Sequence, residues 1–223
     1  MKKLLIILLV LATAFTAYQF LKPDVSDVAA TGLPWQIDVR DDGTSDVFGI
    51  NLGATTFKEA ATQFGIDYEI AVMIDQQDNA NLEMYYSHFK SGPLAGKLVI
   101  SAKAEPSMVT YLAENAVESE YLGTGSRKFT LGQDMMNIGE TLLVSDLTFL
   151  PTASLDAEVI EKLFGKPDQI IDRGESHHYL YEAKGVDVIL NDEGKETLQY
   201  VAPRDFHRLL VPLELEAPQT SSE

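Results

Sequence analysis

The chain of 223 residues contains no cysteine, which excludes disulfides, thiol catalysis and thiolate metal sites. The same absence excludes a bacterial lipid anchor, whose attachment requires a cysteine. Basic residues are also few. Three of the 17 Lys and Arg residues lie in the first 22 positions, so the rest of the chain has 17 − 3 = 14 bases against 34 acids, a formal charge of −20. Such a surface repels phosphate and anionic headgroups, so we expect no nucleic-acid partner, whereas basic ligands and divalent cations remain compatible with it.

The one long uncharged run lies at the N-terminus, where residues 4–21 are flanked by lysines on both sides. A helix of about 18 to 20 such residues covers most of the hydrocarbon core of a bilayer. The alternative is a signal peptide, but the small-residue motifs at 12–14 and 28–30 fit a cleavage site poorly. We therefore expect residues 1–22 to be an uncleaved inner-membrane anchor, with the C-terminal region in the periplasm. Cleavage would instead release the protein into the periplasm.

Recognisable catalytic motifs are missing as well, since the sequence has no G-x-S-x-G and no HExxH. Ser176 precedes two histidines, but no partner that would orient a base is recognisable. The glycine-rich basic stretch 123–128 lacks the framework of a phosphate loop and predicts a flexible connection. The acidic turn at 41–43 lacks the spacing of a calcium loop. We therefore expect no catalytic residue, cofactor or metal.

Three residues are candidates for binding: Trp35, His177 and His178. The two histidines are adjacent in a predicted strand, so their side chains should point to opposite faces and cannot bind one metal together. Trp35 is the only tryptophan. It alternates with Ile37 and Val39 on an apolar strand face, which predicts core packing, and contact with a partner is the alternative.

Hydrophobic patterning after the anchor predicts an α+β fold. The expected parts are a membrane anchor or signal segment at 1–22, a tether at 23–33, a first α+β unit at 34–120, a connector with a short helix and strand at 121–150, a second α+β unit at 151–210 and a disordered tail at 211–223. Expected helices lie near 56–64, 106–117, 133–138 and 156–164, and expected strands near 68–74, 82–89, 98–104, 129–131, 142–150, 176–181, 186–190 and 197–201.

A repeated pattern links the two units. Residues 56–65 and 156–165 are both capped amphipathic helices that end in Phe-Gly, one hundred residues apart. Each should precede a three-stranded antiparallel meander that packs one face on helices. The shared order of elements predicts an internal duplication.

The second unit resembles the small envelope lipoproteins of the SmpA/OmlA type on three features: Phe164-Gly165-Lys166-Pro167, a strand containing Tyr179, and the hairpin at Asp192-Glu193-Gly194. That resemblance implies helices laid on an antiparallel sheet, as in β-lactamase-inhibitor proteins, and a binding or scaffold role. The segments 32–36 and 200–206 extend the likeness to a group of proteobacterial membrane-anchored envelope proteins, which brings no activity with it.

Two functions follow from these features. The first is a membrane-tethered, non-enzymatic binding or scaffold module of the periplasm, for which an envelope protein is the expected kind of partner. The alternative is an exported hydrolase or ligand-sensing enzyme, with His177 or His178 beside Asp172 or Glu182 in a cleft between the units. A deep cleft with a histidine bonded to a carboxylate would favour the enzyme, and a smooth surface with an exposed apolar strip would favour the binding module.

Overall fold

A computed structural model describes residues 32–215 of the chain. The predicted membrane anchor at 1–22, nearly all of the tether and the end of the predicted tail lie outside the described residues. Among the helices that are described, none has the length and apolar character needed to cross a bilayer.

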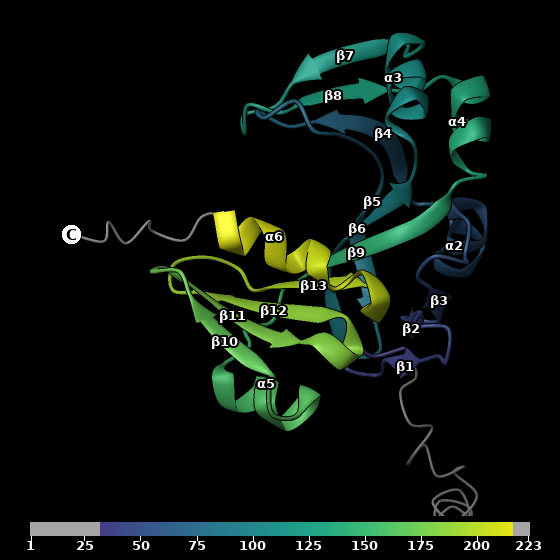
Figure 1. The fold of residues 1–223 in the computed structure, drawn as a ribbon. Coiled ribbons are helices and arrows are strands. Elements are labelled where there is room, and N and C mark those ends of the chain that lie inside the picture. The colour runs from purple at the N-terminus through teal and green to yellow at the C-terminus, as the bar shows by residue number, and fades with distance from the viewer. Residues whose placement is uncertain (1–31, 216–223) are drawn as a thin grey trace, which may run out of the picture. The chain divides into compact units, whose positions relative to one another are not determined.

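The described part is an α+β fold built on one antiparallel sheet, which confirms the predicted class (Figure 1). The sheet has ten strands in the order β10-β11-β12-β13-β9-β6-β5-β4-β8-β7. In chain order these are β4 (Glu69–Ile74), β5 (Ala80–Ser91), β6 (Leu94–Lys103), β7 (Glu118–Tyr121), β8 (Arg127–Thr130), β9 (Leu143–Pro151), β10 (Gln169–Asp172), β11 (Ser176–Tyr181), β12 (Val186–Asn191) and β13 (Thr197–Val201). A small separate sheet contains β1 (Asp38–Val39), β2 (Ser45–Val47) and β3 (Ile50–Asn51).

Helices cover the two faces of the sheet unequally. The outer face carries α2 (Phe57–Phe64), α3 (Pro106–Glu114), α4 (Gln133–Gly139) and α5 (Ala157–Phe164), together with the small sheet. The inner face carries α6 (His207–Leu215), which lies in the hollow of the curved sheet between β13 and the β4-β8-β7 end (Figure 1). The larger hydrophobic core lies on the outer face, and a smaller cluster of Leu180, Val201, Phe206 and Leu213 packs under α6.

Local chemistry explains the two helices that the sequence predicts best. Thr56 caps α2 in a capping box, since its side chain accepts from the Glu59 backbone and Glu59 bonds back to it. The Asp156 side chain accepts from the Val159 N–H and caps α5. Both helices end at a glycine with positive φ, 95° at Gly65 and 86° at Gly165, a conformation that disfavours other residues.

The two halves of the sheet are arranged alike. Counted from the strand that follows the helix of each half, neighbouring strands in the sheet are β4-β5-β6-β9 in the first half and β10-β11-β12-β13 in the second. The last strand of each half, β9 or β13, pairs with that of the other half. The Tyr86 hydroxyl donates to the Gly65 carbonyl at 3.1 Å, and the Tyr181 hydroxyl donates to the Gly165 carbonyl at 3.0 Å. Each half therefore joins its second strand to the end of its own helix by the same bond.

Several elements differ from the expectation. The second half has four strands and not the expected three, since it begins with the exposed strand β10, which was not predicted. The stretch 123–128 does not connect the halves, since it closes the hairpin between β7 and β8. The expected connector 121–150 contributes β8 and β9 to the sheet. Trp35 lies in a turn before β1 and packs, partly buried, against the main core.

Helix α6 was also not predicted. It runs to Leu215 and so includes the first residues of the segment 211–223 that the composition assigns to a disordered tail. Pro212 lies inside this helix, and an internal proline normally argues against one. Packing of the helix against the inner face of the sheet outweighs that local preference.

Candidate ligand-binding site

The inner face of the sheet holds a cleft of about 590 Å³ beneath α6. Its floor crosses the junction of the two halves, because β9 and β13 pair there and both contribute residues. The lining residues are Asp75, Asn81, Asp146, Leu147, Thr148, His178, Asp187, Ile189, Gln199, Tyr200, Val201, Arg208, Leu209, Pro212 and Leu213. The cleft therefore combines carboxylates, one guanidinium and apolar walls.

The centre of this cleft is a histidine bonded to a buried carboxylate. His178 Nδ1 lies 2.7 Å from Asp187 Oδ2, and the two residues are 9 % and 1 % exposed. They meet because β11 and β12 pair with Leu180 opposite Asp187, so both side chains stand on the inner face. Burial raises the pKa of the Asp187 carboxyl, and the neighbouring His178 opposes that rise.

Only one of the two carboxylate oxygens of Asp187 has a hydrogen-bond partner among the described residues. Its Oδ1 atom is buried and has no hydrogen-bond partner among the described residues. A buried carboxylate oxygen without a partner costs free energy, about 1 to 3 kcal/mol or more for a charged group. Since Asp187 lines the cleft, this oxygen is an acceptor that a bound group could use.

Ser176 extends the pair into a row of three polar side chains. Its hydroxyl lies 3.4 Å from His178 Nε2, on the side of the ring opposite Asp187. Residues 176 and 178 share the inner face because they are two apart in one strand. The order serine, histidine, carboxylate resembles the arrangement of a charge-assisted nucleophile, although the serine contact is longer than the 2.6–3.2 Å reach usual for such pairs.

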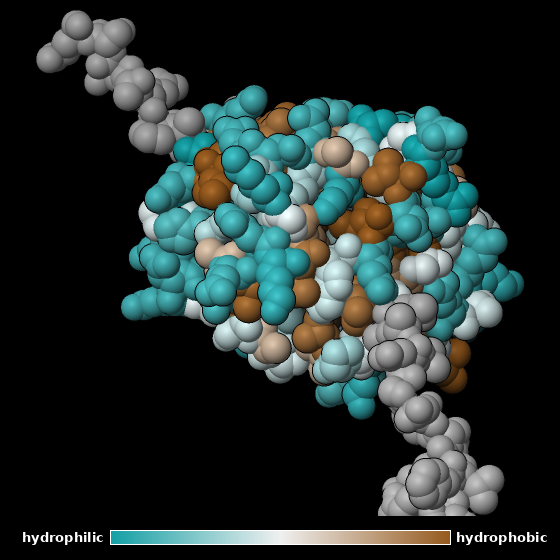
Figure 2. Space-filling view, turned by 90° about the horizontal axis from the view of Figure 1, so that it is seen from below, coloured by the Kyte–Doolittle hydropathy of each residue, from teal (hydrophilic) through white to brown (hydrophobic). Residues whose placement is uncertain are grey.

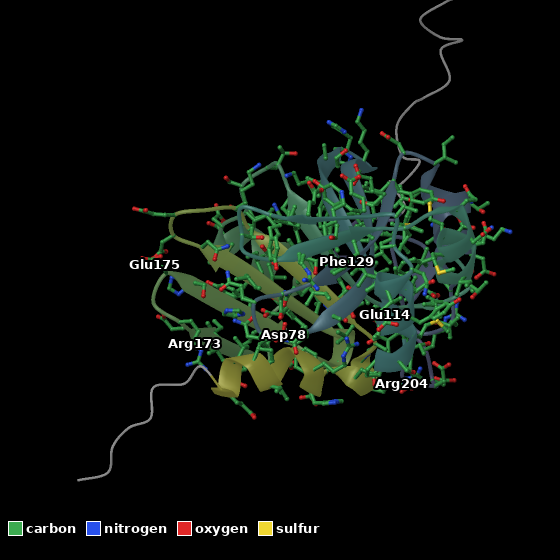
Figure 3. All side chains as sticks on the ribbon, turned by 90° about the horizontal axis from the view of Figure 1, so that it is seen from above. Asp78, Glu114, Phe129, Arg173, Glu175 and Arg204 are labelled. Atoms are coloured by element: carbon green, nitrogen blue, oxygen red, sulfur yellow. The ribbon has the colours of Figure 1, made fainter. Side chains whose placement is uncertain are left out.

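A second polar group ties α6 to the sheet. Arg208 Nη2 on α6 contacts Asp146 Oδ2 on β9 at 2.8 Å, and the Ser145 hydroxyl donates to the same oxygen at 2.6 Å. Near the other end of the helix, the Arg173 guanidinium donates to the Leu213 carbonyl (Figure 3). Both contacts hold α6 over the cleft.

Glu83 lies beyond Asp146 on the same face. The cross-strand register pairs Glu83 with Ser101 and Ser101 with Asp146, so the two carboxyl groups are separated by one strand. Burial, with a smaller contribution from the Asp146 charge, raises the pKa of Glu83 to about 7. Glu83 also lines an adjoining apolar pocket of about 270 Å³ next to Lys128.

The three residues that the sequence singles out do not form one site. His178 lines the cleft, whereas His177 points to the other face, where it is partly buried and lies 3.6 Å from Asp172 and 3.3 Å from Asp192, both of which are exposed. Glu182 is exposed outside the cleft, and Trp35 packs on the outer core. No group of three or more histidine and carboxylate side chains within residues 32–215 is arranged to hold a metal ion.

The residue missed by sequence reasoning is Asp187. It lies in Val186-Asp187-Val188-Ile189-Leu190, a run that is otherwise apolar. Burial of a charged side chain in such a strand costs free energy unless the charge is paired. That single acid was the available signal. The sequence does not identify His178 as the partner of Asp187, because the pairing register of β11 with β12 cannot be deduced from either strand alone.

Comparison with known proteins adds no relative to this description: no family model, no curated protein and no solved structure matches the chain. The site is therefore interpreted from its own geometry.

Proposed function

We propose that this chain is a membrane-tethered periplasmic binding module of the cell envelope, and that its ligand site is the inner cleft. The observation that carries the proposal is the buried Asp187 carboxylate, which lines the cleft and has one oxygen without a partner among the described residues. Ligand pockets in general pair apolar walls with convergent polar groups, and the cleft beneath α6 has apolar residues beside a larger set of polar ones.

The surface outside the cleft gives less support to a broad scaffold contact. Apolar side chains are interspersed with polar ones on the face shown in Figure 2. The most exposed large apolar residues are Ile66 after α2, Tyr121 on β7, Val117 just before β7 and Ile170 on β10, so they are not gathered on one element. A site for a smaller ligand therefore accounts for the polar cleft better than an apolar docking strip does.

The proposal includes a duplication of the binding unit. The matching Phe-Gly helix ends, the matching tyrosine bonds and the mirrored strand orders support it. The insertion of α3, β7, β8 and α4 between β6 and β9 would then be an addition to the first unit. A duplicated sheet of this kind creates a new surface at the junction of the two copies, where the cleft lies.

A cleft-filling variant tests the binding site. Thr148 lines the cleft on β9, and Thr148→Trp would place an indole there, whereas Thr110→Trp makes the same exchange at an exposed position of α3. Each full-length protein is incubated with the small-molecule fraction of a bacterial envelope extract, and retained molecules are released by heat and identified by mass spectrometry. We expect the natural chain and Thr110→Trp to retain the same molecule and Thr148→Trp to lose it. Equal retention by all three would refute the cleft as the site.

The tether is tested separately. We expect the full chain to fractionate with inner membranes and to keep Met1 or Lys2 as its first residue. Recovery of a mature chain that lacks residues 1–14 or 1–30, shown by N-terminal sequencing, would replace the anchor by a cleaved signal segment.

The second candidate function is an exported hydrolase, and the row of Ser176, His178 and Asp187 favours it. In that case the Ser176 hydroxyl attacks an ester carbonyl, and His178 takes the hydroxyl proton and passes it to the departing alcohol. Water then hydrolyses the acyl group from the serine, with His178 again transferring the proton. The cleft with a histidine bonded to a carboxylate is the feature expected of this alternative.

A fluorophosphonate probe distinguishes the two functions, because it labels activated serines covalently. The hydrolase requires labelling at Ser176 that Ser176→Ala and His178→Gln both abolish and that Ser107→Ala, at an exposed serine of α3, leaves intact. An unlabelled natural chain would eliminate the hydrolase and leave the binding module.

A further inference from the structure

The charges around the inner cleft are unequal. Three carboxylates, Asp75, Asp146 and Asp187, line it against a single guanidinium, Arg208. Asp75 is occupied in its own turn, where it accepts from Gln77 and Asn79, and Asp146 is occupied by Arg208. Asp187 is therefore the carboxylate of the cleft with a buried oxygen, Oδ1, that has no hydrogen-bond partner among the described residues.

Part of the cleft lining is apolar. Ile189, Leu209 and Leu213 line the cleft, and Leu213 packs in the cluster that holds α6 on the sheet. Hydrated inorganic cations gain nothing from such walls, whereas an alkyl chain does, at about 25 cal/mol for each Å² removed from water. The described residues also lack a cluster of donors suited to a metal ion.

We infer that the inner cleft binds a small organic cation, whose ammonium or guanidinium group donates to Asp187 Oδ1 and whose alkyl chain lies against Ile189 and Leu209. This inference rests on the proposed binding function and names the class of its ligand. The cleft already accommodates such a group, since the Arg208 guanidinium reaches Asp146 from α6 with its own alkyl chain alongside. A bound cation would repeat that arrangement at the neighbouring carboxylate.

His178 positions the carboxylate for this role. Its bond to Asp187 Oδ2 fixes the carboxyl group and leaves Oδ1 without a partner among the described residues, as the acceptor that we assign to the ligand. A fixed acceptor loses little conformational entropy on binding, so a single charge-assisted bond there contributes more than it would on a mobile surface side chain.

Agmatine, which has both a guanidinium and an ammonium group, is the probe for the first test. Its binding to the full-length chain is measured by isothermal titration, together with Asp187→Asn and with Asp172→Asn. Asp172 is an exposed carboxylate that also lies beside a histidine, so its replacement removes the same charge outside the cleft. We expect Asp187→Asn to weaken binding at least tenfold and Asp172→Asn to change it less than threefold. Equal losses would mean that only net charge matters and would overturn the inference.

A second test needs no variant and so does not depend on how Asp187→Asn folds. The natural chain is titrated with n-butylammonium and with n-butyltrimethylammonium, and the ring signals of His178 are followed by NMR. Both probes have the same charge and chain, but only the first has N–H groups to donate. We expect at least tenfold tighter binding of n-butylammonium with a shift of the His178 signals; equal binding, or no shift, would overturn the inference.

The result for the ligand class and the result for the cleft can be separated. If agmatine and n-butylammonium do not bind while the natural chain retains an anionic or neutral molecule that Thr148→Trp loses, the inference fails and the proposed binding function stands. If Thr148→Trp retains the same molecules as the natural chain, the cleft itself is not the site and both fail.

Discussion

Glu83 should make the protein less stable as the pH rises from about 4.5 to 7. Its carboxyl group is held on the inner face, where it forms no ion pair with another described residue, and burial raises its pKa from 4.5 to about 7. Between these values the folded state binds more protons than the unfolded state, so the free energy of unfolding falls with increasing pH. A shift of about 2.5 units corresponds to an upper limit of about 3 kcal/mol, fully expressed above pH 7. Because the side chain keeps some contact with water, we expect about 2 kcal/mol.

Glu83→Gln tests this reasoning, since glutamine keeps the size of the side chain and has no charge. We expect the variant to match the natural chain near pH 4.5 and to be about 2 kcal/mol more stable at pH 8, which raises the midpoint of thermal unfolding by roughly 4–8 °C. Thermal unfolding of the full-length protein is followed by the fluorescence of its single tryptophan, Trp35, at several pH values. Glu114→Gln, at an exposed position of α3 (Figure 3), is the control and should give no such difference. A difference between Glu83→Gln and the natural chain that stays constant from pH 5 to 8 would refute the argument.

Three further predictions concern the framework, and urea unfolding measures each. Tyr86→Phe and Tyr181→Phe should each lower the free energy of unfolding by about 1 kcal/mol, because each leaves a glycine carbonyl without its donor. Losses below about 0.3 kcal/mol would show that the two hydrogen bonds are unimportant for stability. Gly185→Ala should destabilise the protein by about 2 kcal/mol more than Gly65→Ala. Both glycines have positive φ, but a Cβ at 185 would lie 2.1 Å from a backbone oxygen, whereas one at 65 would meet nothing within 4 Å. Equal losses of stability in the two variants would contradict this reasoning. Thr56→Ala should cost about 1 kcal/mol through loss of the α2 cap, and an unchanged stability would show that the cap is dispensable.

How far the fold could be predicted depended on whether the local signal agreed with the tertiary structure. Helices α2 and α5 were predicted within a residue or so, because a cap, an apolar stripe and a terminal glycine all mark the same segment. Strand β7 was missed because Glu-Ser-Glu-Tyr is exposed at every position and has no alternation to detect. Helix α6 was missed because its stability comes from packing on the inner face, which no local pattern reports.

The candidate site was predictable in part. The sequence selected His178, and two-residue periodicity correctly put it on the face opposite His177. It named Asp172 or Glu182 as the carboxylate beside His177 or His178. Asp172 does lie 3.6 Å from His177, but the partner of His178 is Asp187 on the next strand. A one-residue change in the pairing of β11 with β12 would have turned Asp187 to the other face, so only the register decides which acid the histidine meets.

The two halves of the sheet differ at the position that supplies the polar pair of the cleft. Glu83 and His178 each lie three residues before the tyrosine that bonds the glycine carbonyl in its own half, so they occupy matching places on the inner face. The residue paired with the position next to that tyrosine is Asp187 in the second half and Val99 in the first. His178 thus has a buried carboxylate partner, Asp187. Glu83 has no such partner among the described residues, and burial raises the pKa of its carboxyl group. Under the proposed duplication, one substitution on the third strand explains both why the polar pair belongs to the second half and why the first half has an isolated carboxyl group at the equivalent point.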